Sequence, residues 1–157
     1  MAGELFNLMT GVKIVHVTYR GTGPALTDLL GGRLQVMFDN LPSSLEHVRA
    51  GRLRALAVTT TARVDVLPDI PTVSELVPGY EASSWQGIGA PKNTPVEIVQ
   101  MLNREINSVL ADPKMKGRLA DLGGSILAES PAGFARLIAD DTEKWAKVIR
   151  AANIKAE

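Results

Sequence analysis

Five residues of a glycine-rich turn are the best candidates for chemistry in this sequence. They are Tyr19, Arg20, Gly21, Thr22 and Gly23. The turn follows a β-type run at 13–18 and precedes a helical pattern at 24–30. Unpaired backbone N–H groups and the positive end of the helix dipole favour anions at such a place. Thr22 would add a hydroxyl donor and Arg20 a positive charge, although a tight turn by itself also explains the glycines.

Polar residues also stand at the ends of the next two predicted strands. Asp39 and Asn40 follow the apolar run at 34–38, and Thr59 to Thr61 close the run at 53–60. Ligands of open parallel sheets bind outside the carboxyl ends of the strands, so Asp39 and Asn40 join the candidate site. An Asx turn between strand and helix is the alternative interpretation of this pair. These strand ends contain no convincing pair of a nucleophile and a base, which favours a binding function over catalysis.

Trp85 is the last candidate for the binding site. It stands between two proline-containing stretches, 68–79 and 91–95, which are the candidate boundaries within the chain. Its ring would either stack on a ligand or pack at a hinge between two parts of the protein, and the sequence leaves both interpretations open.

Composition argues against several classes of protein. The chain has no cysteine, which rules out disulfides, iron–sulfur clusters and thiol nucleophiles. His16 and His47 lack partners at ligand spacing, so we expect no metal site. The glycine turn has Leu26 where a dinucleotide motif needs a third glycine, so no cofactor is expected. Lys plus Arg and Asp plus Glu both number 17, and this zero net charge argues against a nucleic-acid partner. No membrane-spanning run and no signal peptide are visible.

Short β-type runs alternate with helical patterns, which predicts an α/β fold with a largely parallel sheet. The expected strands are at 13–18, 34–38, 53–60, 84–90 and 125–128. The first expected helices are at 2–10, at 24–30, and from a cap at Ser43 or Ser44 to Ala50. A short helix is expected to begin at Thr72, and a longer one at 94–111 has Thr94 as its cap and Pro95 at its first position. Two more helices are expected after Asp112-Pro113 and from Ser130-Pro131. The helix to Ala111 and the last helix each carry an apolar face, which predicts that both pack on a core.

Several runs taken together resemble one family. They are 16–32 (HVTYRGTGPALTDLLGG), 36–44 (VMFDNLPSS), 51–59 (GRLRALAVT), 67–73 (LPDIPTV), 89–95 (GAPKNTP) and Leu102-Asn103. In combination they are similar to the Bug-type receptors, the periplasmic substrate-binding proteins of tripartite tricarboxylate transporters. The resemblance covers essentially the whole chain, and Thr18 is a mild departure at a position where a proline is expected.

The resemblance implies a periplasmic-binding-protein-like fold of type II. Two lobes with parallel-rich sheets then close on the ligand in the manner of a Venus flytrap. Members of the family are longer, so this chain looks truncated, with only their carboxyl-terminal half. Residues 1–83 would be the later part of the second lobe, on the side of the ligand cleft. Residues 84–157 would return to the first lobe as a mostly helical segment.

By the same resemblance the protein is an extracytoplasmic receptor and not an enzyme. It would bind a small carboxylate or an amino-acid-like ligand in the periplasm and deliver it to the membrane subunits of a transporter. One alternative is a truncated gene product with no binding activity of its own, and a remote alternative is a small α/β enzyme. Lobe faces that the missing half would cover are expected to promote self-association.

Overall fold

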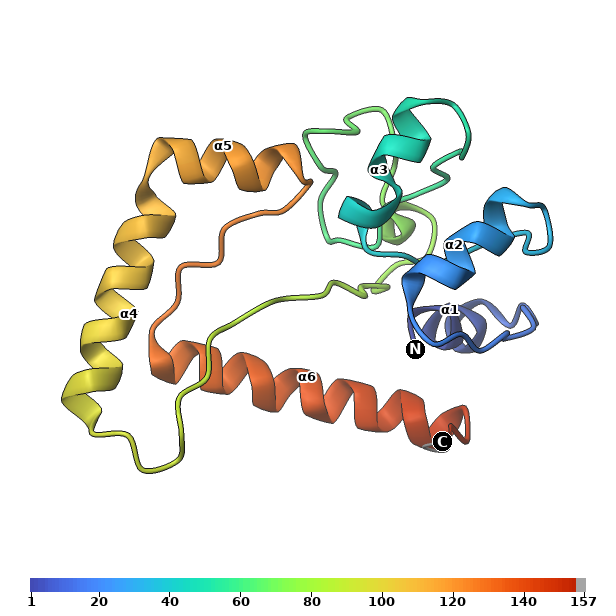
Figure 1. Ribbon diagram of the computed structural model, residues 1–157. Coiled ribbons are helices and arrows are strands. Elements are labelled where there is room, and N and C mark those ends of the chain that lie inside the picture. The colour runs from blue at the N-terminus through green and yellow to red at the C-terminus, as the bar shows by residue number, and fades with distance from the viewer. Residues whose placement is uncertain (155–157) are drawn as a thin grey trace. The chain divides into compact units, whose positions relative to one another are not determined.

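The computed structural model describes residues 1–154, which form two compact units (Figure 1). Unit 1 comprises Met1–Ser84 together with the chain from Val148 onward, and unit 2 comprises Trp85–Lys147. The chain therefore leaves unit 1 at Ser84 and returns to it near the end. Residues 155–157 of the predicted second segment lie outside the described residues. The assignment of the two predicted segments to receptor lobes stays a prediction.

The helices that lie wholly in unit 1 are α1 (Ala2–Thr10), α2 (Thr22–Leu30), α3 (Leu41–Arg49) and the short 3-10 helix η1 (Val73–Glu75). Each stands where the sequence predicts a helix. The end of α1 is set by Gly11, whose φ of 73° is readily adopted only without a side chain. The predicted start of α3 is wrong. The helix begins at Leu41 rather than after Ser43 or Ser44, and no side chain caps it.

The five predicted strands do not form within the described residues. The β-type pairing found there is one parallel bridge, between Val58 and Thr72. A strand forms only when a second strand pairs with it through backbone hydrogen bonds. In a parallel pair, that second strand is distant in the sequence. In the run at 13–18, the backbone of one residue pairs with a side chain instead of with a second strand. Asn7 Oδ1 accepts from the Ile14 N–H and Asn7 Nδ2 donates to the Ile14 carbonyl, both at 3.1 Å.

An aromatic cluster forms part of the core of unit 1. Tyr80 is its most deeply buried member, with 1% of its surface exposed. The Phe6 ring stands edge-on to Tyr80 at a centroid distance of 6.0 Å and lies 5.8 Å from the ring of Phe38. The Tyr80 hydroxyl donates to the Ala2 carbonyl at 3.1 Å, which fastens the start of α1 to a segment almost eighty residues later.

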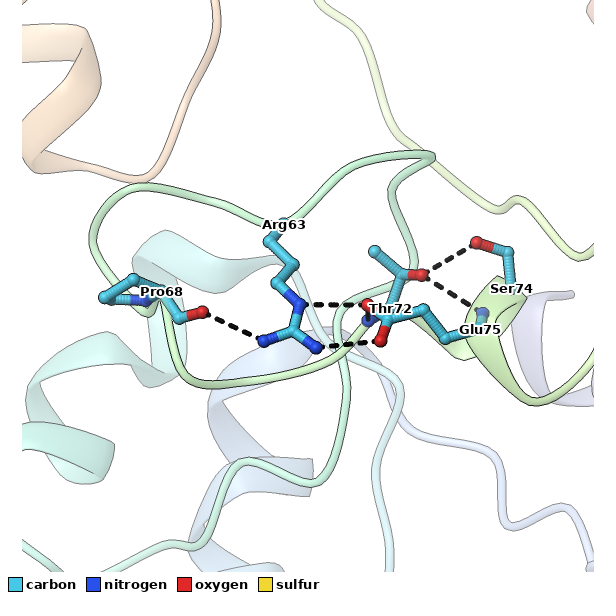
Figure 2. A network of polar contacts seen from close by, with 5 residues as sticks. All are labelled: Arg63, Pro68, Thr72, Ser74 and Glu75. Carbon is cyan, nitrogen blue, oxygen red and sulfur yellow. Dashed lines mark hydrogen bonds and ion pairs between the residues drawn. The ribbon is translucent and has the colours of Figure 1, made fainter.

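A polar clip holds the loop between Arg63 and Glu75 (Figure 2). The Arg63 guanidinium donates through Nε and Nη2 to the two oxygens of Glu75, at 2.9 and 2.8 Å, and through Nη1 to the Pro68 carbonyl. The predicted capping box is confirmed, since Thr72 and Glu75 each accept from the other's backbone N–H. These contacts, with Arg63 the largest cause, lower the pKa of Glu75 to about 2. The clip steadies Thr72, whose backbone pairs with Val58.

Unit 2 contains α4 (Val96–Ala111), α5 (Pro113–Asp121) and most of α6 (Pro131–Ala151). The start of α5 is as predicted, because Asp112 accepts from two backbone N–H groups of its first turn. Ser130 likewise accepts from the Gly133 N–H at the start of α6. The predicted Thr94 cap is wrong. Pro95 occupies the capping position of α4 with φ −53° and ψ 141°, and no side chain caps the helix.

The apolar face of α4 is only partly covered, with Val99, Ile106 and Leu110 half-buried. Ile98, Leu102 and Val109 are 41 to 53% exposed, although their spacing predicts a core-facing helix. Periodicity shows which side of a helix is apolar, but burial also needs a second element to cover that side. The face of α6 is covered in part, with Val148 buried and Ile138 exposed. Self-association through such exposed faces stays a prediction.

Candidate ligand-binding site

A cavity of about 450 Å³ lies within unit 1. Its wall is formed by α1, residues 14–17, the turn before α2, residues 36–40 and the isolated positions Thr59 and Ala82. Its volume lies in the range of about 300–1,000 Å³ that is usual for small-molecule sites. Thr59 and Ala82 are joined by two hydrogen bonds, from the Ala82 N–H to the Thr59 carbonyl and from Thr59 Oγ1 to the Ala82 carbonyl. The bridge at Val58 and the polar clip hold this side of the wall.

Five of the eight predicted binding residues line this cavity. They are Tyr19, Gly21, Thr22, Asp39 and Asn40. Arg20 is exposed and lies outside the wall, as does Gly23. Trp85 belongs to unit 2, where its indole Nε1 donates to Asp141 Oδ2 at 2.8 Å and its ring stands edge-on to Phe134.

The N-terminus of α2 opens at the cavity without a side-chain cap. Gly21 precedes the helix with φ 108°, a backbone conformation that needs glycine. Gly23 has no such requirement, because its φ is not positive and a Cβ there would meet no atom within 4 Å. The tight turn therefore explains one of the two glycines. The first N–H groups of α2 have no partner within a helix, so they are available to an anion.

Tyr19 fastens the turn to the side of α2. Its hydroxyl donates to Asp28 Oδ2 at 2.8 Å, and Arg33 donates to Asp28 Oδ1 at 2.9 Å. The hydrogen bond from Tyr19, followed by that from Arg33, lowers the pKa of Asp28, and the same bond to Asp28 raises the pKa of Tyr19. The phenol donor is thus occupied within the protein, although Tyr19 is part of the wall.

Asp39 carries a buried carboxylate oxygen, Oδ2, without a hydrogen-bond partner among the described residues. Asn40 differs, since its Oδ1 accepts from Ser84 Oγ at 2.8 Å. Sequence reasoning missed Glu4 and Asn7, which also line the cavity. Both lie in a helix whose sequence carries no ligand signal, and only the fold brings α1 to the site.

The described residues offer little else for a site. A hollow of about 410 Å³ lies between α4 and α5, but the Asp112 carboxylate there already caps α5. Within residues 1–154, no group of three His, Asp or Glu side chains is arranged to hold a metal ion. No helix in that range combines the length and the apolar character that crossing a membrane requires.

Comparison with known proteins decides the family. Residues 1–154 match the family described as the tripartite tricarboxylate transporter family receptor. The chain belongs to this family. Among curated members of the receptor family, the protein BugT of Bordetella pertussis is 40% identical over 153 residues, which are 97% of this chain and 47% of BugT. The resemblance inferred from the sequence is therefore confirmed.

Solved receptor structures have the same chain path over about half their length. R. palustris Rpa4515 with adipate is 41% identical, with a TM-score of 0.88 over 98% of this chain and 52% of that chain. The periplasmic binding protein BugD is 32% identical, with a TM-score of 0.83 over 99% and 53% of the two chains. MatC from Rhodopseudomonas palustris with bound malate is 31% identical, with a TM-score of 0.81 over 94% and 52%. The fold is thus that of part of a periplasmic binding protein.

Proposed function

We propose that this chain carries one side of the binding site of a solute receptor for small carboxylates. The observation that supports this most directly is the uncapped N-terminus of α2 at the 450 Å³ cavity of unit 1. The solved relatives with adipate and malate point to the same ligand class. The receptor would act in the periplasm and pass its ligand to the membrane subunits of a tripartite tricarboxylate transporter, without catalysis.

Binding would rest largely on backbone and hydroxyl donors, in a wall that also includes His16 and Met1. The wall contains no Lys or Arg side chain among the described residues, so a carboxylate cannot form a salt bridge to such a side chain there. The N–H groups of the first turn of α2 and the hydroxyl of Thr22 would receive it instead. The positive end of a helix dipole adds to this attraction within its first turn.

The remaining part of the site would come from a further stretch of receptor. The chain spans about half the length of BugT and of the solved receptors. In a two-lobed, flytrap-like receptor, residues 1–83 would belong to one lobe and residues 84–157 to the other. The second lobe would then close over the ligand held by α2. The alternative is that the chain alone has no binding activity.

Isothermal titration with adipate, malate and succinate tests the proposal. The key variant is Thr22→Val, which keeps the shape of the side chain and removes its hydroxyl. We expect affinity to fall by about 0.5–1.5 kcal/mol, the net value of one hydrogen bond. Thr60→Val is the matched control, because the Thr60 hydroxyl donates to the Ala62 carbonyl outside the cavity. Equal affinities for both variants would refute the role of Thr22, and no binding by the parent chain would favour the alternative.

A further inference from the structure

Two β-type runs of unit 1 have backbone groups that no other described part of the chain pairs with. No backbone N–H or C=O group of residues 15–18 or 36–39 forms a hydrogen bond with another described residue. Neither run belongs to a helix or to the parallel bridge at Val58. A row of free N–H and C=O groups is a template on which a strand of another polypeptide can pair. We call residues 15–18 and 36–39 together the open edge.

The open edge also exposes apolar side chains. Val15, Val17 and Val36 are 84%, 51% and 37% exposed, and all three belong to the wall of the 450 Å³ cavity. Valine is β-branched and favours strands. Apolar groups gathered on a surface mark a place where another molecule binds. A small carboxylate would satisfy neither the valines nor the free backbone, so this part of the wall suits a different occupant from the N-terminus of α2.

The position of the two runs and the length of the relatives indicate what that occupant is. Both runs border the same cavity, so one strand that enters it can reach either of them. This chain corresponds to 47% of BugT and 52% of the Rpa4515 chain. These receptors therefore contain a comparable length of further polypeptide. A strand added to an open edge gains backbone hydrogen bonds, while its alternate side chains cover the apolar groups beside them.

We infer that the open edge is a docking site for a β-strand supplied by the part of a receptor that lies outside the matched half. Backbone pairing would hold the strand, and its side chains would cover the three valines. The inference goes beyond the proposed function, because it concerns a protein partner and does not require the chain to bind a carboxylate.

The test mixes this chain with separate polypeptides. The partners are the part of BugT and the part of Rpa4515 that this chain does not match, each produced on its own. Size exclusion with light scattering measures the composition of any complex, and titration calorimetry measures its affinity. Hydrogen exchange followed by mass spectrometry reports on the amides of the open edge.

Two variants make the test specific. Val15→Asp places a charge where apolar cover is expected. Leu76→Asp is the matched control, because Leu76 is 81% exposed in the same unit and lies outside the cavity wall. Both side chains are exposed in the chain alone, so both variants should keep the circular dichroism of the parent. If Val15→Asp does not fold, Val17→Asp replaces it.

We expect a one-to-one complex with at least one partner and slower exchange at residues 15–18 or 36–39. Val15→Asp should weaken the complex at least tenfold, since docking would bury an unpaired carboxylate, and Leu76→Asp should leave the affinity unchanged. The inference is overturned if neither partner binds, or if the open edge exchanges equally fast in the complex. Protection that appears in the chain alone and grows with its concentration would assign the edge to a second copy, and would also overturn it. Carboxylate titrations of the chain without a partner judge the proposed function separately.

Discussion

Replacing Tyr80 tests whether the aromatic cluster holds unit 1 together. Tyr80→Phe removes one hydroxyl, which donates to the Ala2 carbonyl at 3.1 Å, and leaves the ring in place. One such hydrogen bond contributes about 0.5–1.5 kcal/mol to stability. Tyr80→Ala also removes the ring of a residue that has only 1% of its surface exposed. Loss of a buried aromatic ring costs about 3–5 kcal/mol, including the cavity left behind.

Thermal unfolding followed by far-UV circular dichroism measures both costs. Each kcal/mol lowers Tm by about 2–4 °C in a protein of this size. We therefore expect a small shift for Tyr80→Phe and a loss several times larger for Tyr80→Ala. A Tyr80→Ala variant no less stable than Tyr80→Phe would refute the packing argument, since the ring would then contribute nothing beyond its hydroxyl.

The pH dependence of stability gives an independent check on the same residue. Burial, followed by the negative charge of Glu81, raises the pKa of Tyr80 from 10.0 to about 12. The unfolded chain therefore releases the phenol proton at lower pH than the folded chain. Tyr80 should stabilise the fold below pH 10, and this contribution should disappear as pH rises from about 10 to about 12. The difference between the parent chain and Tyr80→Phe isolates the effect, and a difference that is flat in pH would contradict it.

Two further predictions concern the polar clip and a helix cap. The pKa of Glu75 is lowered from 4.5 to about 2, chiefly by Arg63, so its stabilisation should be present above about pH 4.5 and fade as pH falls toward 2. Arg63→Gln should remove most of this dependence in acid titrations of the urea midpoint, and an unchanged acid limb would argue against the clip. Asp112→Ala should cost α5 about 0.5–2 kcal/mol by uncapping the N–H groups of Lys114 and Met115. Hydrogen exchange should then accelerate in α5 and not in the middle of α4, and uniform exchange would contradict a local cap.

The candidate site was predictable in part. The turn at Tyr19–Thr22 and the pair Asp39-Asn40 were recognisable because glycine, hydroxyl and carboxylate groups follow apolar runs. The structure places them on one cavity wall. Glu4 was missed because its helix shows only amphipathic spacing. Arg20, chosen for its charge, lies outside the wall, since the charge of a residue says nothing about the direction in which the backbone presents it.

Local signals in the sequence determined where helices begin and end. Gly11 ends α1 through its own positive φ, Thr72 and Glu75 cap each other across three residues, and Asp112 caps the next turn of chain. Each of these interactions is completed within about one helical turn, so the sequence alone contains all its partners. The family, too, could be read from the residue runs by themselves.

Only the tertiary structure decided what depends on distant partners. The predicted strands found no ladder beyond the Val58–Thr72 bridge, and the apolar face of α4 found only partial cover among the described residues. The cavity exists because α1, the turn before α2 and the isolated Thr59 meet in space. Strand pairing, burial and cavities each depend on two or more segments that are far apart in the chain. Hydrophobic periodicity identifies the apolar side of one segment and does not identify the segment that will pack against it.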